Sequence, residues 1–174
     1  MIGNRLSLDF YGRDVLEVAP ELVGKSLVRS FDSSGKQEFI ITEVEAYRGG
    51  EDLACHASKG KTARTDVMFR QGGLVYVYLI YGMHWMLNFV TGESENPQAV
   101  LIRGLAGCYG PGRLAKRLEI TKEFYGEDLS ASSKLWVEDR GISPTVIVAP
   151  RIGVDYAGKE WASKPWRFFT NDYK

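Results

Sequence analysis

Hydrophobic and polar positions alternate with two different periods along the chain, and each period predicts a type of element. Apolar residues at helical spacing between Asp14 and Leu22 predict a helical segment that Pro20 divides into two short pieces. β-Rich runs at Ser26–Phe31 and Phe39–Tyr47, with turn-forming residues between them, predict a hairpin. The N-terminal part is therefore expected to supply helical pieces and two strands of an antiparallel sheet.

The rest of the chain predicts a long loop and then more strands than helices. Residues 49–73 have little periodicity and several turn residues, which is typical of a functional loop in a compact domain. Further elements are predicted as strands at Leu74–Ile80, Met83–Val90, Ala99–Arg103 and Val146–Ala149, and as helices at Gly110–Glu119 and around Leu129–Leu135. Since no repeat or linker divides residues 1–174, we predict one domain of the α+β class.

An uncharged stretch from Gln71 to Gly92 is long enough to span a membrane. Its glycines and its β-rich alternation instead predict two adjoining buried elements. The first residues lack the pattern of a signal peptide, and two cysteines, Cys55 and Cys108, are typical of a reducing compartment. We therefore expect a cytoplasmic protein without a secretory or transmembrane segment.

The charge of the chain is balanced, because 22 Lys and Arg stand against 22 Asp and Glu. A protein that binds nucleic acid through bulk electrostatics would be basic, so a DNA or RNA function has to depend on local patches. Two such patches exist, since residues 59–71 carry four basic side chains against Asp66 and residues 111–122 carry four against Glu119.

Missing motifs exclude several chemistries. Gly60-Lys61-Thr62 resembles the end of a phosphate-binding loop, but Cys55 stands where that motif needs its first glycine. The dinucleotide fingerprint, the zinc-deaminase pair of motifs and the nucleophile elbow of hydrolases do not occur. With only His56 and His84, a histidine-rich metal site is not expected. The remaining chemistry uses carboxylate, tyrosine, arginine and water, without a metal or cofactor.

One predicted strand carries acidic residues in a regular pattern. Glu43, Glu45 and Tyr47 lie on one face of the strand Phe39–Tyr47, because side chains repeat every second residue. Such a face is typical of a solvated surface or of an acidic site, and the segment leaves both open.

Tyrosine and arginine supply two further candidates. Tyr76 and Tyr78 share a strand face and Tyr81 falls in the following turn, which indicates either an aromatic platform or a Tyr-rich core. Arg103 ends an apolar strand, as a salt-bridge partner or as an active-site cation.

A set of motifs follows one another in a characteristic order along the chain. They are Val44-Glu45-Ala46-Tyr47, Glu51-Asp52, His56, Met68-Phe69, Tyr76-Val77-Tyr78-Leu79-Ile80-Tyr81-Gly82-Met83, Asn88, Val100-Leu101-Ile102-Arg103, Gly110-Pro111-Gly112-Arg113-Leu114, Arg151-Ile152-Gly153-Val154 and Lys164-Pro165-Trp166-Arg167-Phe168. In this order they resemble the alkyladenine (3-methyladenine) DNA glycosylase family, the methylpurine glycosylases, and the likeness runs from about Leu8 to Phe169. The resemblance implies a curved, mostly antiparallel sheet flanked by short helices, like the C-terminal domain of formyltransferases.

The resemblance also implies an activity. Members of the family flip a damaged purine out of duplex DNA and hydrolyse its N-glycosidic bond, which leaves an abasic site. Glu45 matches the general base that activates water, while Arg103 and the backbone carbonyl of Ile152 match groups that hold this water. No lysine matches a Schiff-base nucleophile, so we expect a monofunctional glycosylase without lyase activity.

Other matched residues imply how the base and the DNA are held. Tyr47 on one side, with His56 and Tyr78 on the other, match the residues that sandwich the flipped base, and electron-rich rings favour a cationic purine. Asn88 matches the residue that clashes with the amino group of guanine. Tyr81 matches the wedge that enters the duplex, and Met83 flanks it.

Further contacts to DNA are expected at Arg64, Gly112, Arg113 and Lys116. A helix N-terminus favours anions, although an ordinary helix with a solvated basic face would have the same residues. The expected partner is damaged double-stranded DNA, bound by a monomer. The candidate lesions are 3-methyladenine, 7-methylguanine, hypoxanthine and ethenoadenine.

The sequence departs from the family in two places. Members of the family usually have a longer segment that contains a Glu-Pro motif after the arginine that Arg103 matches, and in this chain residues 104–109 stand in its place, which indicates a compact version. After Arg64, where asparagine is common in the family, this chain has Thr65-Asp66. Two alternatives are a non-catalytic lesion-binding protein of the same fold and a tRNA-binding module. A pure binder does not need both Glu45 and Arg103, and a tRNA module explains neither this pair nor Tyr81.

Overall fold

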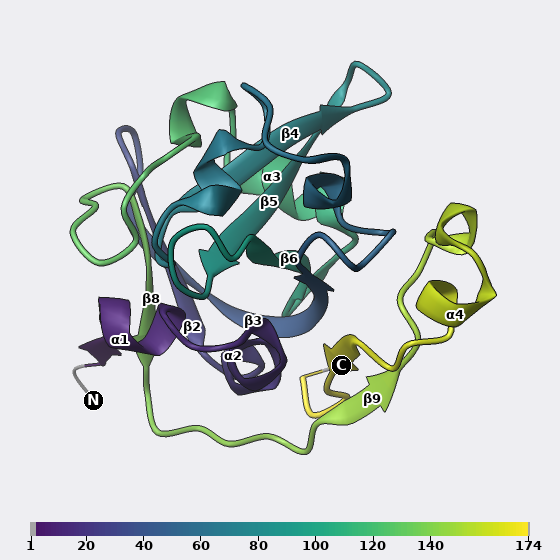
Figure 1. The fold of residues 1–174 in the computed structure, drawn as a ribbon. Coiled ribbons are helices and arrows are strands. Elements are labelled where there is room, and N and C mark those ends of the chain that lie inside the picture. The colour runs from purple at the N-terminus through teal and green to yellow at the C-terminus, as the bar shows by residue number, and fades with distance from the viewer. Residues whose placement is uncertain (1–2, 174) are drawn as a thin grey trace.

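A curved sheet forms the centre of the structure, a computed structural model that describes residues 3–173 (Figure 1). Its strands are β1 (Asn4–Arg5), β2 (Ser26–Phe31), β3 (Gly35–Arg48), β4 (Val75–Ile80), β5 (His84–Thr91), β6 (Gln98–Leu105), β7 (Cys108–Tyr109), β8 (Leu135–Asp139), β9 (Ile147–Ala149) and β10 (Arg167–Phe169). The main order is β1-β8-β2-β3-β6-β5-β4, and β10 joins β3 to β9. All strand pairs among the described residues are antiparallel, which confirms the α+β class.

Helices are few and short. They are α1 (Leu8–Tyr11), α2 (Val15–Leu22), α3 (Pro111–Arg117) and α4 (Lys159–Ala162), with 3-10 turns η1 (His56–Lys59), η2 (Asp66–Phe69), η3 (Lys122–Phe124) and η4 (Asp155–Ala157). The long loop predicted at residues 49–73 contains η1 and η2. Within residues 3–173, no helix is long and apolar enough to cross a bilayer. The uncharged stretch around residues 71–92 instead forms β4 and β5.

Strand β3 connects the two halves of the sheet. Its first part pairs with β2 as the predicted hairpin, and its second part pairs with β6. The pairing register shifts between Ile41 and Val44, where an irregularity bends the strand. Val44 and Ala46 point into the core, because alternate side chains face opposite sides, so Glu45 and Tyr47 lie on the other face.

The hydrophobic core lies between the sheet and its helices. Buried side chains of α2, α3 and the central strands pack together, among them Val18, Leu22, Leu27, Ile41, Phe89, Ile102, Leu105 and Leu114. Burial of this surface contributes roughly 25 cal/mol per Å², which makes it the main source of stability.

The prediction that Pro20 divides the first helical segment into two pieces is wrong. Helix α2 is continuous from Val15 to Leu22 with Pro20 inside it. Asp14 begins the helix by accepting a hydrogen bond from the Leu16 amide. Burial of the apolar face along the whole helix compensates for the one hydrogen bond that proline cannot donate.

The helix predicted around Leu129–Leu135 is wrong. This segment is a turn in which the Asp128 carboxylate accepts hydrogen bonds from the amide and hydroxyl of Ser130. Leu135 then begins β8, a strand that lies between β1 and β2 and that the sequence pattern had not indicated. The segment forms a turn because Asp and Ser side chains make local hydrogen bonds to the backbone and to each other, which favours turns over helices.

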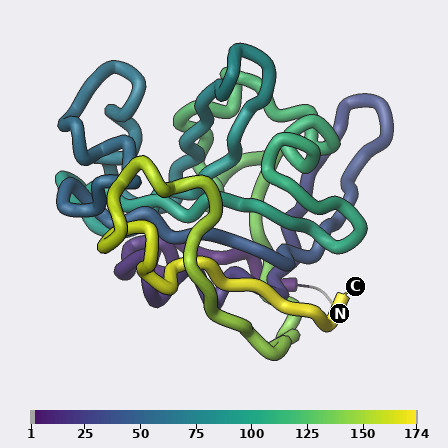
Figure 2. Tube along the Cα trace, turned by 90° about the vertical axis from the view of Figure 1, so that its right-hand side faces the viewer, coloured from purple at the N-terminus to yellow at the C-terminus, as the bar shows by residue number. Residues whose placement is uncertain are grey.

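The C-terminal third of the chain returns to the end of β3. Residues 150–166 run beside the loop that follows β3 (Figure 2). Strand β10 pairs with β3 so that Arg167 lies opposite Glu45. Residues that are far apart in sequence therefore meet around the second half of β3.

Candidate active site

A cleft of about 710 Å³ opens beside the end of β3. Its walls come from the loop after β3, from the β4–β5 hairpin and from residues 152–156. A smaller cavity of about 40 Å³, here called the inner pocket, shares Tyr47, His56, Tyr78 and Tyr156 with the cleft. Buried Asn88 also lines the inner pocket.

Glu45 is 0 % exposed, which rules out the solvated surface that the strand pattern had left open. Its Oε2 accepts a hydrogen bond of 2.8 Å from the Tyr47 hydroxyl, and its Oε1 accepts one of 2.7 Å from the Ile152 amide. Burial raises the pKa of Glu45, while Arg103 and these two hydrogen bonds oppose the increase. The site therefore holds a carboxylate that is desolvated yet supported on both oxygens.

Arg103 lies on β6 beside two carboxylates. Its Nε is 3.5 Å from Oε1 of Glu45 and 3.5 Å from Oε1 of Glu43. This nitrogen is buried and finds no hydrogen-bond acceptor among residues 3–173. A buried N–H group needs a partner, so the geometry suits a small polar molecule that lies beside both Arg103 and Glu45.

Ile152 reaches the site as the sequence predicted, but the contact differs from the one expected. Its amide N–H donates to Glu45, whereas the predicted role belongs to its carbonyl. The role of the carbonyl stays a prediction.

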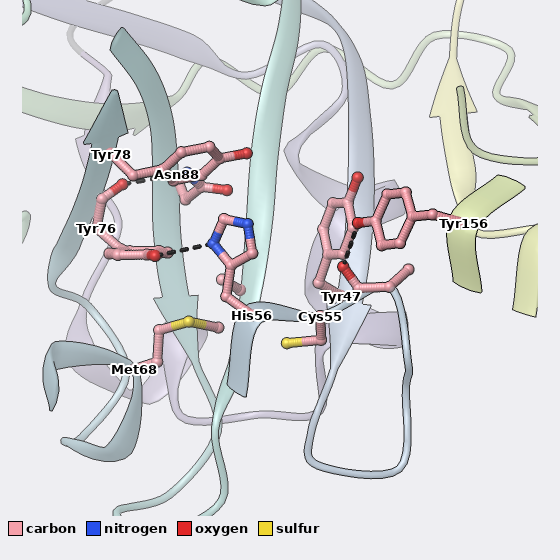
Figure 3. Close-up of a pocket in the computed structure, with 10 residues that line it drawn as sticks. Tyr47, Cys55, His56, Met68, Tyr76, Tyr78, Asn88 and Tyr156 are labelled. Carbon is pink, nitrogen blue, oxygen red and sulfur yellow. Dashed lines mark hydrogen bonds between the residues drawn. The ribbon is translucent and has the colours of Figure 1, made fainter. Parts of the chain in front are cut away.

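Aromatic rings form the two sides of the inner pocket. Figure 3 shows Tyr47 and Tyr156 on one side and Tyr76 and Tyr78 on the other, with the His56 ring between them. The rings of His56 and Tyr78 are 4.5 Å apart between centroids in an edge-to-face arrangement. The three residues predicted to sandwich a base thus line one pocket, which also opens into the larger cleft through the side chains that the two cavities share.

His56 is neutral at physiological pH. Burial lowers its pKa to about 4, and the charges of Arg64 and Lys59 act in the same direction. Its Nδ1 lies 2.9 Å from the hydroxyl oxygen of Tyr76, which fixes the orientation of the ring.

Asn88 lies in the wall of the inner pocket (Figure 3). Its side-chain nitrogen donates to the carbonyl oxygens of Tyr76, at 3.2 Å, and Met86, at 3.4 Å. These two hydrogen bonds to backbone atoms of β4 and β5 fix the orientation of the Asn88 amide group in the pocket wall.

The hairpin of β4 and β5 carries Tyr81 and Met83 at its tip, beyond the rest of the sheet (Figure 1). Tyr81 is 86 % exposed, and Met83 is also exposed. Tyr81 has a φ of 52° and Gly82 a φ of 67°, the conformation of a tight hairpin turn. The turn presents a large apolar ring to solvent at the edge of the cleft.

The four predicted phosphate contacts lie in two places. Arg64 is exposed at the cleft, and its guanidinium carbon is 5.1 Å from the centre of the Tyr78 ring. Arg113 and Lys116 are exposed on α3, whose first turn contains Gly112 close to His84. Arg64 therefore lines the cleft, while Arg113 and Lys116 lie on α3, whose first residue Pro111 borders the same cleft.

Sequence reasoning missed Tyr156 as a pocket residue. Its exposed ring lines both cavities, and its hydroxyl donates to the Ala54 carbonyl at 3.0 Å. Tyr156 stands two residues after the end of the motif Arg151-Ile152-Gly153-Val154, so an aromatic residue close to a matched motif was the available signal.

Comparison with known proteins points to one family. The sequence profile of the family described as Methylpurine-DNA glycosylase (MPG) matches residues 9–107 and 105–174. The two matched parts meet at the turn between β6 and β7, where the chain is expected to be shorter than the family.

Similar proteins cover nearly the whole chain. A protein of Methanocella arvoryzae is 46% identical over 187 residues, which span 96% of this chain and 92% of the relative. A protein of Wolbachia pipientis wMel is 49% identical over 170 residues, with 94% and 89% covered. A protein of Psychrobacter cryohalolentis is 43% identical over 183 residues, with 87% and 86% covered. All three carry the name "Putative 3-methyladenine DNA glycosylase".

Proposed function

The chain belongs to the methylpurine-DNA glycosylase family of DNA-repair hydrolases, which act on N-glycosyl bonds, and we propose that it excises damaged purines from double-stranded DNA. The substrates are 3-methyladenine first, and 7-methylguanine, hypoxanthine and ethenoadenine as further lesions. The observation that carries the proposal is the buried Glu45 next to Arg103, at the side of a pocket lined by aromatic rings.

Glu45 is the general base in this mechanism. A water held by the Glu45 carboxylate and the Arg103 Nε attacks the sugar carbon C1′ while the bond from C1′ to the purine nitrogen breaks. The proton of the water passes to Glu45, the hydroxyl stays on C1′, and the base leaves with the bonding electrons. The position of the Arg103 Nε, 3.5 Å from Oε1 of Glu45, supports this role, since one water can then contact both groups.

The aromatic walls bind the flipped base. Tyr47 stacks on one face of the purine, and His56 with Tyr78 contacts the other. A cationic alkylated purine is attracted to electron-rich rings and is also a good leaving group. The neutral state of His56 supports this assignment, because a charged imidazolium would repel such a base. Asn88 clashes with the amino group of guanine and thereby excludes this base.

The surrounding surface binds the duplex. Tyr81 enters the stack in place of the flipped nucleotide and Met83 supports it, which offsets an unstacking cost of a few kcal/mol. Arg64, Arg113 and Lys116, with the amides near Gly112, contact phosphates. The protein acts as a monomer in the cytoplasm on chromosomal DNA, and residues 1–174 form one glycosylase domain like the formyltransferase C-terminal domain.

The reaction ends at the abasic site. No lysine of this sequence matches a Schiff-base nucleophile, which supports hydrolysis by water and hence a reaction without strand cleavage. A non-catalytic lesion-binding protein of the same fold is the alternative. The buried Glu45 carboxyl beside Arg103 argues against it, because recognition of a lesion alone does not need this water-holding pair.

Release of free base from defined DNA tests the proposal. Methylated duplex DNA reports 3-methyladenine and 7-methylguanine by chromatography, and oligonucleotides with hypoxanthine or ethenoadenine report the neutral lesions. Undamaged and single-stranded DNA are substrate controls, and Glu45→Gln prepared in parallel controls for contaminating glycosylases.

We expect released 3-methyladenine and strands that break only after alkali. Tight binding of damaged duplex without release of any base would establish the non-catalytic alternative instead.

A further inference from the structure

A buried ion pair lies behind the proposed hydrolytic centre. We propose that Asp52 and Arg151 are positioning residues, which hold the Ile152 amide and the Tyr47 ring against Glu45. The significance of Glu45 as a base rests on the proposed function, but the contacts of the pair do not.

The pair is tightly fixed by its geometry. Arg151 Nη1 is 2.6 Å from Oδ2 of Asp52, and Arg151 Nη2 is 2.9 Å from Oδ1. The guanidinium also donates to the carbonyls of Ala46, at 3.0 Å, and Trp161, at 3.2 Å. Asp52 accepts from the amides of Arg48 and Ala54. The pair therefore connects β3, the loop after it and the C-terminal segment.

Removal of either charge from this buried ion pair is energetically unfavourable. Both side chains have 0% relative exposure, and a buried charge that loses its partner is strongly unfavourable. The planar guanidinium satisfies both carboxylate oxygens at once, which a lysine ammonium cannot do. Residue 151 therefore requires the planar shape of an arginine side chain as well as its positive charge.

The first consequence is at Ile152, the next residue in the chain. Ile152 is 49% exposed as a residue, so packing of its side chain does little to fix the backbone here. The Arg151 anchor lies one residue away and sets where the Ile152 amide points. That amide makes the 2.7 Å hydrogen bond to Oε1 of Glu45.

The second consequence is at Tyr47. The guanidinium carbon of Arg151 lies over two rings, 4.8 Å from the centre of Tyr47 and 5.0 Å from the centre of Trp166. The Tyr47 hydroxyl donates to the other oxygen of Glu45. One ion pair therefore supports the donors to both oxygens of the proposed base.

These two hydrogen bonds favour the ionised form of Glu45, against the effect of burial. A small displacement of Ile152 or Tyr47 weakens them and makes Glu45 easier to protonate. A role confined to stability would lower the melting temperature and leave the protonation of Glu45 unchanged.

The test is a titration of Glu45 in the full chain without DNA. Glutamate labelled with ¹³C at the side-chain carboxyl is followed by NMR from pH 3 to pH 9, roughly, and the Glu45 signal is assigned by its loss in Glu45→Gln. The variants are Arg151→Lys and Asp52→Asn. The matched control is Arg29→Lys, because Arg29 is also buried and lies 4.6 Å from the Phe31 ring and 4.9 Å from the Phe124 ring.

We expect both pair variants to raise the titration midpoint of Glu45 by about one pH unit, which corresponds to the loss of one hydrogen bond to a charged group. Arg29→Lys is expected to leave the midpoint unchanged. An unchanged midpoint in the pair variants, or an equal increase in Arg29→Lys, would overturn the proposal. Asp52→Asn keeps an acceptor for Arg151 and decides the question if Arg151→Lys does not fold.

Single-turnover excision from methylated DNA gives the functional readout. The acid limb of the rate-against-pH profile should move with the titration midpoint in each variant. If wild-type protein releases no base, the proposed function fails, while the NMR titration still decides whether the pair positions Glu45.

Discussion

Glu45 combines complete burial with two hydrogen bonds, and this combination predicts its role in catalysis. Glu45→Gln keeps the size and an acceptor but cannot take a proton. We expect single-turnover excision of 3-methyladenine to fall by about 10² to 10⁴, the usual contribution of a general base. Binding of damaged duplex, measured by fluorescence anisotropy, should stay within about threefold of wild type. Cleavage at the wild-type rate would remove Glu45 from the mechanism.

The pKa of Glu45 also predicts how stability depends on pH. Burial raises its pKa in the folded state, so the folded state binds the proton more tightly than the unfolded state. The stabilising contribution is complete below the ordinary glutamate pKa and is lost as the pH rises through the folded pKa. Glu45→Gln should therefore be more stable than wild type at pH 8 and lose this advantage near pH 4, roughly, in urea denaturation.

His56 has the opposite dependence. Its folded pKa of about 4 lies below the ordinary histidine value of 6.5, so the unfolded state binds more protons between these limits. Its contribution to stability is complete above pH 6.5 and is lost as the pH falls towards 4. His56→Gln should flatten the decline of unfolding free energy across this range. His84→Gln, at an exposed position, is the control and should leave the decline unchanged.

At the scale of elements, the β4–β5 hairpin is a rigid support for one exposed ring. The strands pair regularly from Val75 opposite Phe89 to Ile80 opposite His84, and the turn places Tyr81 and Gly82 at positive φ. A tight turn on two paired strands loses little entropy when its tip enters DNA. The hairpin is therefore suited to insertion between base pairs.

Tyr81→Ser tests this use of the hairpin. Loss of the ring should lower single-turnover excision from duplex DNA about tenfold, since the proposed insertion of Tyr81 would offset the cost of unstacking. Val148→Ser removes an exposed apolar side chain on β9 and is the control, expected to match wild type. Unchanged kinetics of Tyr81→Ser on duplex substrates would show that another residue fills the gap left by the flipped base.

At the scale of the whole molecule, a net charge of zero is the sum of an uneven distribution. Arg113 and Lys116 are exposed on α3, whereas acidic Glu93 and Glu95 lie in the loop between β5 and β6. DNA binding should therefore be modest and strongly dependent on salt, because each phosphate contact releases a counterion.

Lys116→Ala should weaken binding to damaged and undamaged duplexes equally and reduce the slope of log K against log salt by about one. Lys36→Ala, at the start of β3 beside Trp136, is the control and should not change the slope. A loss of affinity confined to damaged DNA would place Lys116 in lesion recognition instead.

Local patterns were sufficient for much of the fold. The β2–β3 and β4–β5 hairpins, α3 and the α+β class follow from the period of apolar residues and from turn residues that act within a few positions. Patterns failed where distant contacts decide, as at Pro20, which burial keeps inside a helix, and at Leu135, which pairs with β2.

The family follows from the sequence alone, because motifs such as Glu45-Ala46-Tyr47 and Tyr76-Val77-Tyr78 are recognisable along the chain. The folded chain adds that Glu45 is fully buried, that Tyr156 lines the pocket and that Arg151 meets Asp52. The physical reason is that burial and ion pairing depend on segments about a hundred residues apart, whereas sequence periodicity reports only on neighbours.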